Sequence, residues 1–475
     1  MNGSAISQNM EGTRGLSHGN YKTIWFFFAV LVIAGFMNLD NIKNFFAYLV
    51  ICAAVMWPAW LWMRMGKPGI PILPAVALLH LQYYALPILI GNYKHYHSPT
   101  EILTAGLSVA LYLIVVTAVW MLIVLQRSAK KPAIVPQGSR EMIKIEMAGL
   151  WFGVLFYIGL FYGLYSWMGS AFGVIRAIAL ILISISCFLV GVTWGLGKLS
   201  SRQKRNAVLL ISFLLVLDWT SLFLVTGVMW IAVALLGYFA SSRRVPVTAL
   251  LIAIPMIYIL HAGKAEMRDR YWGESEHLST VTQIPSFYMG WTSSGISAIT
   301  EGKEEQNVFE RASLLEMLLR AQDETPSRFA FLYGETYEAL PALLVPRFLW
   351  PDKPVSQEAM NMLNLRYGLV HPSRSGEIKT AIGWGIISEA YVNFGMFGIV
   401  GIGIVMGILI GVVSEWSKGK PAVSLPTLVA VATMIACMDL EMDFTYLCTV
   451  FFQSFIAVFI FYGTFRFLTR QSGAA

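Results

Sequence analysis

The sequence has little charge for its length. Asp, Glu, Lys and Arg make up 13% of its 475 residues, whereas an ordinary soluble domain has about 25%. Hydrophobic residues make up 57%, and the mean hydropathy is +0.63. A water-soluble fold of this size cannot bury so much apolar surface, which excludes a soluble metabolic enzyme and a nucleic-acid-binding protein. The composition predicts an integral membrane protein.

Cysteine is also scarce. Cys52, Cys187, Cys437 and Cys448 lie inside apolar runs without Cys-x-x-Cys spacing, which argues against a disulfide framework and against a zinc site. No small-residue cleavage site follows the first apolar run, so we interpret that run as a retained span. The sequence also lacks a detectable internal repeat.

Apolar runs near the length that a membrane helix needs, about 20 residues, recur along the chain. Single spans are predicted at Ile24–Asn38, Phe45–Met63, Ile70–Ile90, Ile102–Leu125, Leu150–Trp167, Ala171–Leu196, Val247–Ala262, Gly395–Trp416, Leu425–Met438 and Tyr446–Phe467. Ala207–Ala240 is too long for one span. Because basic residues flank this run on both sides, both of its ends belong in the cytoplasm. The run therefore predicts a hairpin of two spans that turns outside, between Asp218 and Gly227.

The distribution of Lys and Arg predicts the orientation, since short cytoplasmic loops carry most of them. Alternate short loops are basic, and the loops between them hold only Lys43 and Lys94. We predict an all-α, polytopic integral membrane protein of about twelve transmembrane helices. Its parts are a cytoplasmic tail (1–22), nine helices (23–262), a large extracytoplasmic loop (263–393), three helices (394–468) and a second cytoplasmic tail (469–475).

Two apolar pieces of the large loop are predicted to lie against the membrane. Phe309, Ala312, Leu315 and Leu319 recur at helical spacing, which is typical of an interfacial helix. Phe329–Leu344 is too short to span, so we expect a re-entrant or interfacial segment. The loop is therefore expected to hug the membrane rather than form a soluble lid.

The large loop is rich in arginine, whose guanidinium group binds phosphate oxygens in a bidentate manner. Several converging guanidinium groups suit a diphosphate. The candidates for such an anion site are Arg268, Arg270, Arg347, Lys353, Arg366 and Arg374 in the loop, with Arg176 about one turn into its span from the outside. Each loop residue alone is better explained as a solvated charge or a contact to lipid headgroups, whereas the set together favours an anion site.

Carboxyl groups gather at the same predicted face. Glu389 stands where the outer membrane face is expected to begin, and a partly desolvated carboxylate there can act as a general base. Asp439, Glu441 and Asp443 flank another outer turn, as Asp218 does at the hairpin turn. The alternative is that these groups pair with arginines or with one another in the headgroup zone.

One predicted span carries small residues at a regular spacing. Gly403, Gly407 and Gly411 are four residues apart, and this spacing allows two membrane helices to approach closely. We interpret these glycines as packing residues.

With these residues in view, the chain resembles the Wzy-like oligosaccharide repeat-unit polymerases of bacterial envelopes, the O-antigen and exopolysaccharide polymerase group. The resemblance rests on the turn Pro346–Pro354 (Pro-Arg-Phe-Leu-Trp-Pro-Asp-Lys-Pro), on Glu389–Gly395 before a span, and on the layout with one large late outer loop. Arg374 and Gly385 match the Arg-x10-Gly spacing described for the family. A second large outer loop with another copy of that motif is missing from this sequence.

The resemblance implies glycosyl transfer at the outer face of the bacterial inner membrane, with both termini cytoplasmic and the large loop periplasmic. A growing glycan on undecaprenyl diphosphate would pass to the sugar hydroxyl of a fresh lipid-linked repeat unit. Glu389, or as a second choice His371, would be the base, and the basic residues above would bind the diphosphate. A diphosphate is already a good leaving group, so no metal or other cofactor is expected. The implied partners are the undecaprenyl-diphosphate-linked oligosaccharide, the lipid bilayer and a chain-length regulator or export complex, and nucleic acid is not among them.

Three alternatives stay open. A lipid-linked glycan ligase, or another polyprenyl-phosphate glycosyltransferase, needs nearly the same parts and differs in its acceptor. A transporter or flippase tends to have repeats and a binding site at the membrane midplane, whereas here the ionisable residues gather at one predicted face. A structural role in a synthesis complex also fits a loop rich in Arg and Pro.

Overall fold

The structure is a computed structural model, and the residues that it describes are almost entirely helical or in turns, without a β-sheet. It describes residues 24–65, 69–91, 93, 95–125, 140–169, 171–242, 246–272, 278, 280–301, 313–343, 345, 350, 353–355, 357–370 and 382–473. The all-α prediction is confirmed for this part of the chain.

Eight helical segments of the described residues are long and apolar enough to cross a membrane. They are α2 (Ile42–Arg64), α3 to α4 with the π-helical turn η1 between them (Ile72–Ile90), α5 (Pro99–Leu125), α6 (Arg140–Phe161), α7 (Ala171–Gly195), α9 (Leu224–Ser242), α16 (Gly385–Ser417) and α18 (Phe444–Gly473). A ninth candidate is α10 (Val247–Ala262) with α11 (Lys264–Trp272), which are bent by 51° against each other.

Every predicted span coincides with a helix, but four of these helices do not meet the length and composition of a span by themselves. Ile24–Asn38 and α17 (Leu425–Cys437) are apolar but short, and α10 qualifies only together with α11. The fourth, α8 (Ser201–Trp219), begins with a basic stretch. Twelve spans thus remain a prediction. The predicted hairpin break does occur where expected, because α8 ends at Trp219 and α9 begins at Leu224.

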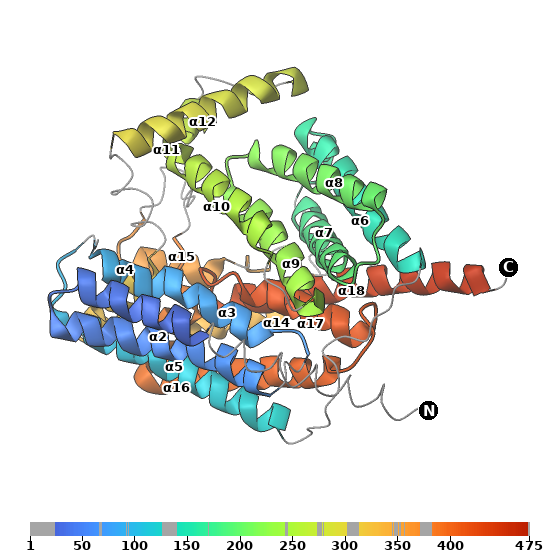
Figure 1. Ribbon diagram of the computed structural model, residues 1–475. Coiled ribbons are helices and arrows are strands. Elements are labelled where there is room, and N and C mark those ends of the chain that lie inside the picture. Colours follow the sequence, from blue (N-terminus) through green and yellow to red (C-terminus); the bar gives the residue numbers. More distant parts are fainter. Residues whose placement is uncertain are drawn as a thin grey trace. The chain divides into compact units, whose positions relative to one another are not determined.

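The chain divides into two compact units. Unit 1 comprises residues 1–132, 312–419 and 436–452, and unit 2 comprises 133–311, 420–435 and 453–475. In unit 1, α2 packs against α3 and α5, and α5 packs against α16 (Figure 1). In unit 2, α7 packs against α6 and α9, α6 against α8, and α10 against α12 (Ile284–Thr300), a helix of the large loop that the sequence patterns did not indicate.

The predicted packing role of the regularly spaced glycines is confirmed. A Cβ atom at Gly407 would lie 2.7 Å from the Cβ of Val119 in α5, and one at Gly403 would lie 3.0 Å from the Cγ1 of Val115. A Cβ atom at either position would force its neighbour to shift, so the glycines of α16 permit its close approach to α5.

A kink separates residues Gly385–Asn393, which we call the outer piece of α16 after their predicted location, from the rest of the helix. Gly395 has φ 61° and ψ −143°, a conformation that favours glycine. The carbonyl groups of Val392 and Asn393 accept hydrogen bonds from the N–H groups of Leu332 and Tyr333, both at 3.1 Å. The kink therefore holds a segment of the large loop against the outer piece of α16.

The structure corrects the account of the first of the two loop pieces. Helix α13 (Leu314–Glu324) exists as predicted, with Phe309 and Ala312 outside the described residues. However, Leu315 and Leu319 are 0% and 1% exposed, because α13 packs on α5 and α16 rather than presenting this face to lipid. The second piece, 329–344, has turns, the 3-10 turn η4 (Glu335–Tyr337) and the short α14 (Leu340–Leu343) in its described residues, and its re-entrant or interfacial position stays a prediction.

Candidate functional site

Two buried carboxyl groups meet at the outer piece of α16. Glu389 and Asp443, which precedes α18, are both 0% exposed. Glu389 Oε2 accepts a hydrogen bond from the N–H of Phe444 at 2.7 Å, and Asp443 Oδ1 accepts one from the N–H of Tyr446 at 2.6 Å. Both groups thus bind N–H groups at the start of α18, where the helix dipole favours negative charge.

One oxygen of each carboxyl group in this pair has no hydrogen-bond partner in the described part of the chain. Glu389 Oε1 and Asp443 Oδ2 are buried and have no hydrogen-bond partner among the described residues. Buried polar atoms are nearly always paired in folded proteins. An unpaired carboxyl oxygen on both members therefore marks a place for a proton, a water molecule or a substrate hydroxyl.

A polar network from the large loop covers the carboxyl pair. Asn393 Nδ2 donates to Thr336 Oγ1 at 2.8 Å and to the carbonyl of Glu389 at 2.9 Å. The N–H of Gly334 donates to Asn393 Oδ1 at 2.9 Å, and Thr445 Oγ1 donates to the Thr336 carbonyl at 3.0 Å. Asn393 and Thr336 thus tie the loop, the outer piece of α16 and the start of α18 together.

Two carboxyl groups in the turn between α17 and α18 have raised pKa values. Burial raises the pKa of Asp443, because its charge loses the solvation of water, and hydrogen bonds from backbone N–H groups only partly oppose this rise. Burial and the neighbouring charge of Glu441 also raise the pKa of Asp439. This turn therefore holds protons more tightly than exposed carboxyl groups do.

Arg366 contacts the loop residues Phe329 and Ala330. It is half-buried at the end of α15 (Glu358–Arg366), where its Nη2 donates to the carbonyl of Ala330 at 2.6 Å. Its guanidinium carbon is 5.3 Å from the ring centroid of Phe329, and that of Arg328 is 4.9 Å from the same ring. Arg366 Nε is buried without a partner among the described residues. Two guanidinium groups therefore converge on one aromatic ring.

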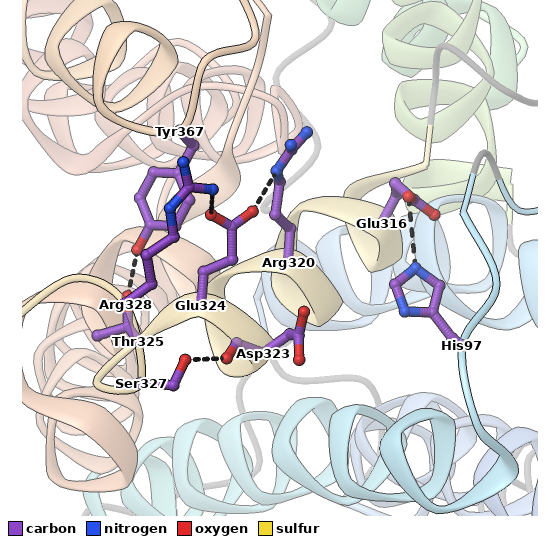
Figure 2. Close-up of polar contacts among 9 residues, drawn as sticks. All are labelled: His97, Glu316, Arg320, Asp323, Glu324, Thr325, Ser327, Arg328 and Tyr367. Atoms are coloured by element: carbon purple, nitrogen blue, oxygen red, sulfur yellow. Dashed lines mark hydrogen bonds and ion pairs between the residues drawn. The ribbon is translucent and has the colours of Figure 1, made fainter.

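A carboxylate of α13 holds Arg328 in this position. Figure 2 shows Glu324 between two guanidinium groups, with Arg320 Nε 2.8 Å from its Oε1 and Arg328 Nη1 2.9 Å from its Oε2. Arg328 remains 68% exposed despite this ion pair. The three arginines 320, 328 and 366, which we call the arginine cluster, outnumber the one carboxylate between them.

The loop segment 329–337 connects the arginine cluster to the carboxyl pair. Phe329 contacts the guanidinium groups, while Thr336 lies at Asn393 and Thr445. Seven residue steps separate Phe329 from Thr336, so their Cα atoms are at most about 25 Å apart. The same loop segment thus contacts both the arginine cluster and the network at the carboxyl pair.

A second buried ionisable contact lies at the start of α13. His97 Nε2 is 3.4 Å from Glu316 Oε1, and the two side chains are 8% and 6% exposed (Figure 2). His97 Nδ1 also lies 3.7 Å from Glu101 Oε2. The hydrogen bond to Glu316 raises the pKa of His97, and burial only partly offsets this rise. The contact fastens α13 to the segment before α5.

The remaining predicted site residues of unit 1 are Lys353, Arg347, Arg374 and His371. Lys353 Nζ donates to the carbonyls of Leu343 and Val345, at 3.0 and 2.6 Å. His371, Arg347 and Arg374 lie outside the described residues.

Three of the predicted anion ligands belong to unit 2. The guanidinium carbon of Arg268 lies 4.2 Å from the ring centroid of Trp272, and Arg270 Nη2 is 2.9 Å from Glu266 Oε1. Arg176 acts electrostatically on Asp218, whose Oδ1 accepts a hydrogen bond from Tyr157 Oη at 2.8 Å. The predicted diphosphate ligands are therefore divided between the two units.

Sequence reasoning named Glu389 but not its surroundings. Asp443 was identified only as part of an acidic turn, and Arg320 and Arg328 were not singled out. Thr336 gave no signal by type or spacing, and Asn393 was noted only as part of the Glu389–Gly395 segment that carries the resemblance. Within the described part of the chain, no three His, Cys, Asp or Glu side chains are grouped so as to hold a metal ion.

The apolar helices and this site define a class of protein: an all-helical chain with the helices of a multi-pass membrane protein and a buried carboxyl pair at the end of one of them. More specifically, the chain belongs to the family described as a domain of unknown function (DUF8712), whose model matches residues 139–469. No curated protein and no solved structure matches the chain.

Proposed function

We propose that the protein is a membrane glycosyltransferase that joins polyprenyl-diphosphate-linked oligosaccharide repeat units into a surface polysaccharide, at the outer face of the bacterial inner membrane. The observation that carries this proposal is the carboxyl pair. Glu389 is fully buried beside Asp443 and keeps an unpaired oxygen, as a general base requires before it receives a substrate hydroxyl.

In the proposed reaction, Glu389 Oε1 accepts the proton of the acceptor sugar hydroxyl. The hydroxyl oxygen attacks the anomeric carbon of the donor glycan, and the bond from that carbon to the diphosphate oxygen breaks. The electron pair of this bond leaves with the polyprenyl diphosphate. Asp443 supports the base because two adjacent carboxyl groups hold a proton more readily than one group does.

The arginine cluster supplies the positive charge that a leaving diphosphate needs. Arg328 and Arg366 converge on Phe329 within the same loop segment that covers the carboxyl pair. Arg347 and Arg374 in the large loop are further candidate ligands, and His371 is the alternative base. The lipid bilayer delivers both substrates, and a chain-length regulator or export complex is the expected protein partner.

The proposal is tested in cells by replacing the base. Glu389→Gln should abolish chain extension and cause single lipid-linked repeat units to accumulate, as in a strain that lacks the chain. Glu338→Gln is the matched control, because Glu338 is an exposed carboxylate of the same loop. Membrane levels of both variants are measured by immunoblot. Polymer of normal length from Glu389→Gln would contradict the proposal, and Arg347→Ala tests the anion site in the same way.

A ligase differs from this polymerase only in the acceptor. With a ligase, single repeat units would not be the species that accumulates. Long polymer would instead remain on the polyprenyl carrier, so the length of the accumulated lipid-linked glycan separates the two reactions.

A transporter is the second candidate, and a specific observation favours it. Glu146, in the candidate span α6, is 0% exposed, and its Oε1 accepts a hydrogen bond from Thr193 Oγ1 at 2.9 Å. Carboxyl groups inside candidate spans are typical of proton pathways. A cysteine-accessibility scan along α6 decides: alternating access from both membrane faces supports transport, and constant protection supports the enzyme.

A further inference from the structure

A pocket of about 400 Å³ lies between the helix Ile24–Asn38 and α2 in unit 1. The first helix contributes Ile24, Trp25 and Phe28 to its lining. The side chains that line the pocket are all apolar. Its volume falls within the ~300–1,000 Å³ of small-molecule sites.

The spacing of residues along α2 explains how the pocket forms. Met56 and Trp57 are three and four residues after Ala53, and Trp60 is four and three residues after them, so the four lie on one face of the helix. Ala53 is exposed, and its small side chain leaves a hollow beside the large indole rings. This face differs from the one that buries Ile51, Val55 and other residues inside unit 1.

One positive charge stands at the end of this apolar stripe. Arg64 follows Trp60 by four residues, is exposed, and has its guanidinium carbon 5.0 Å from the centroid of the Trp60 ring. The cation–π contact holds the guanidinium group beside the pocket. A pocket that is apolar along its length and cationic at one end is complementary to a lipid with an anionic headgroup.

The charge distribution predicts the membrane leaflet. Arg64 and Lys67 form one of the basic clusters that mark short cytoplasmic loops. The cytoplasmic leaflet carries anionic lipids. Since the proposed glycosyl transfer takes place at the opposite face, the pocket is separate from the substrate site and does not depend on that function.

We propose that this pocket is a binding site for an anionic glycerophospholipid of the cytoplasmic leaflet. The acyl chain lies along Ala53, Trp57 and Trp60, and the headgroup phosphate pairs with Arg64. One Arg at a membrane surface favours an anionic over a zwitterionic lipid by about five-fold.

The test uses the full chain reconstituted in nanodiscs that contain phosphatidylglycerol or phosphatidylcholine with brominated acyl chains. Bromine quenches tryptophan fluorescence on contact. The quenching due to the pocket is the difference in quenching between the natural chain and the double variant Trp57→Phe, Trp60→Phe. For this part of the quenching we expect phosphatidylglycerol to be preferred by about five-fold. Arg64→Gln should remove the preference, and Arg64→Lys should keep it.

Arg202→Gln is the matched control, because Arg202 is an exposed arginine with the same predicted cytoplasmic location that does not line the pocket. Its variant should keep the preference. Equal quenching by both lipids in the natural chain would reduce the site to ordinary boundary lipid and overturn the proposal. Displacement of the brominated lipid by a polyprenyl phosphate, but not by unlabelled phosphatidylglycerol, would assign the pocket to an isoprenoid and overturn it as well.

Discussion

The contact between α16 and α5 gives a prediction whose magnitude follows from the structure. The same substitution, Gly→Ala, is made at Gly407 and at Gly401, six residues apart in α16. A Cβ atom at Gly407 would lie 2.7 Å from the Cβ of Val119 and 3.0 Å from the carbonyl oxygen of Val116, whereas one at Gly401 would meet nothing within 4 Å. Both variants gain the same helix propensity, up to about 1 kcal/mol.

The difference between the two variants therefore isolates the cost of the close approach. Overpacking a well-packed site costs about 1–3 kcal/mol, so Gly407→Ala should be less stable than Gly401→Ala by this amount. Gly411→Ala should fall between them, because the nearest atom there is the Cδ1 at the end of the flexible Ile123 side chain, at 2.9 Å.

The free energy of unfolding is measured in detergent micelles by titration with a denaturing detergent, with helical content as the signal. Equal stability of the Gly407 and Gly401 variants would refute the reasoning. It would mean that α16 and α5 do not pack through these glycines.

Three further predictions concern unit 1. Because Glu316 raises the pKa of His97 above its ordinary value of 6.5, the contact should stabilise the fold fully below about pH 6.5 and lose this effect as pH rises through the folded-state pKa. Thermal unfolding between pH 5 and 9 should show this slope in the natural chain but not in His97→Gln. Burial raises the pKa of Asp443, so its ionisation should destabilise the fold as pH rises above about 4. The stability of Asp443→Asn relative to the natural chain should therefore be higher at pH 8 than at pH 4. A stability difference between the two chains that stays constant across this range would contradict the assignment. Asn393→Ala leaves several polar groups unpaired, and should lower the unfolding free energy by about 2–3 kcal/mol, whereas a loss within 0.5 kcal/mol, as at a typical surface site, would show that the network does not hold the loop.

Hydropathy predicted the helical segments well, because the backbone polar groups of an apolar run in a membrane are paired when the run is a helix. The hairpin break between α8 and α9 was predicted from the length of the apolar run and from the basic residues that flank it, such as Arg202 and Arg243. By length and composition, the described residues support eight of the twelve predicted spans, or nine when α10 and α11 are taken together. Ile24–Asn38 and α17 carry the right composition but are short.

The surroundings of a helix are harder to predict than its presence. The leucines of α13 were recognised as an apolar face, but a periodic pattern does not tell whether protein or lipid covers that face. In the structure, Gln322 Nε2 of α13 donates to Ser108 Oγ of α5 at 2.8 Å, so the helix is fixed to protein. Only the contact itself reveals the partner.

The candidate site shows the same limit. Glu389 was identified from its place at the start of a predicted span, which is local information. Its pairing with Asp443 depends on how α18 starts beside the outer piece of α16, and one sequence without its relatives does not encode this contact in any local pattern. The roles of Thr336 and Asn393 arise from the kink at Gly395, whose position no periodicity indicated.

The most direct test of the proposed function uses purified protein in proteoliposomes. Lipid-linked oligosaccharide is extracted from cells that lack the chain and is added to the outer surface. The account predicts a ladder of longer glycans with release of one polyprenyl diphosphate per linkage, and no ladder from Glu389→Gln. An unchanged oligosaccharide, or one that has only crossed the bilayer, would contradict it.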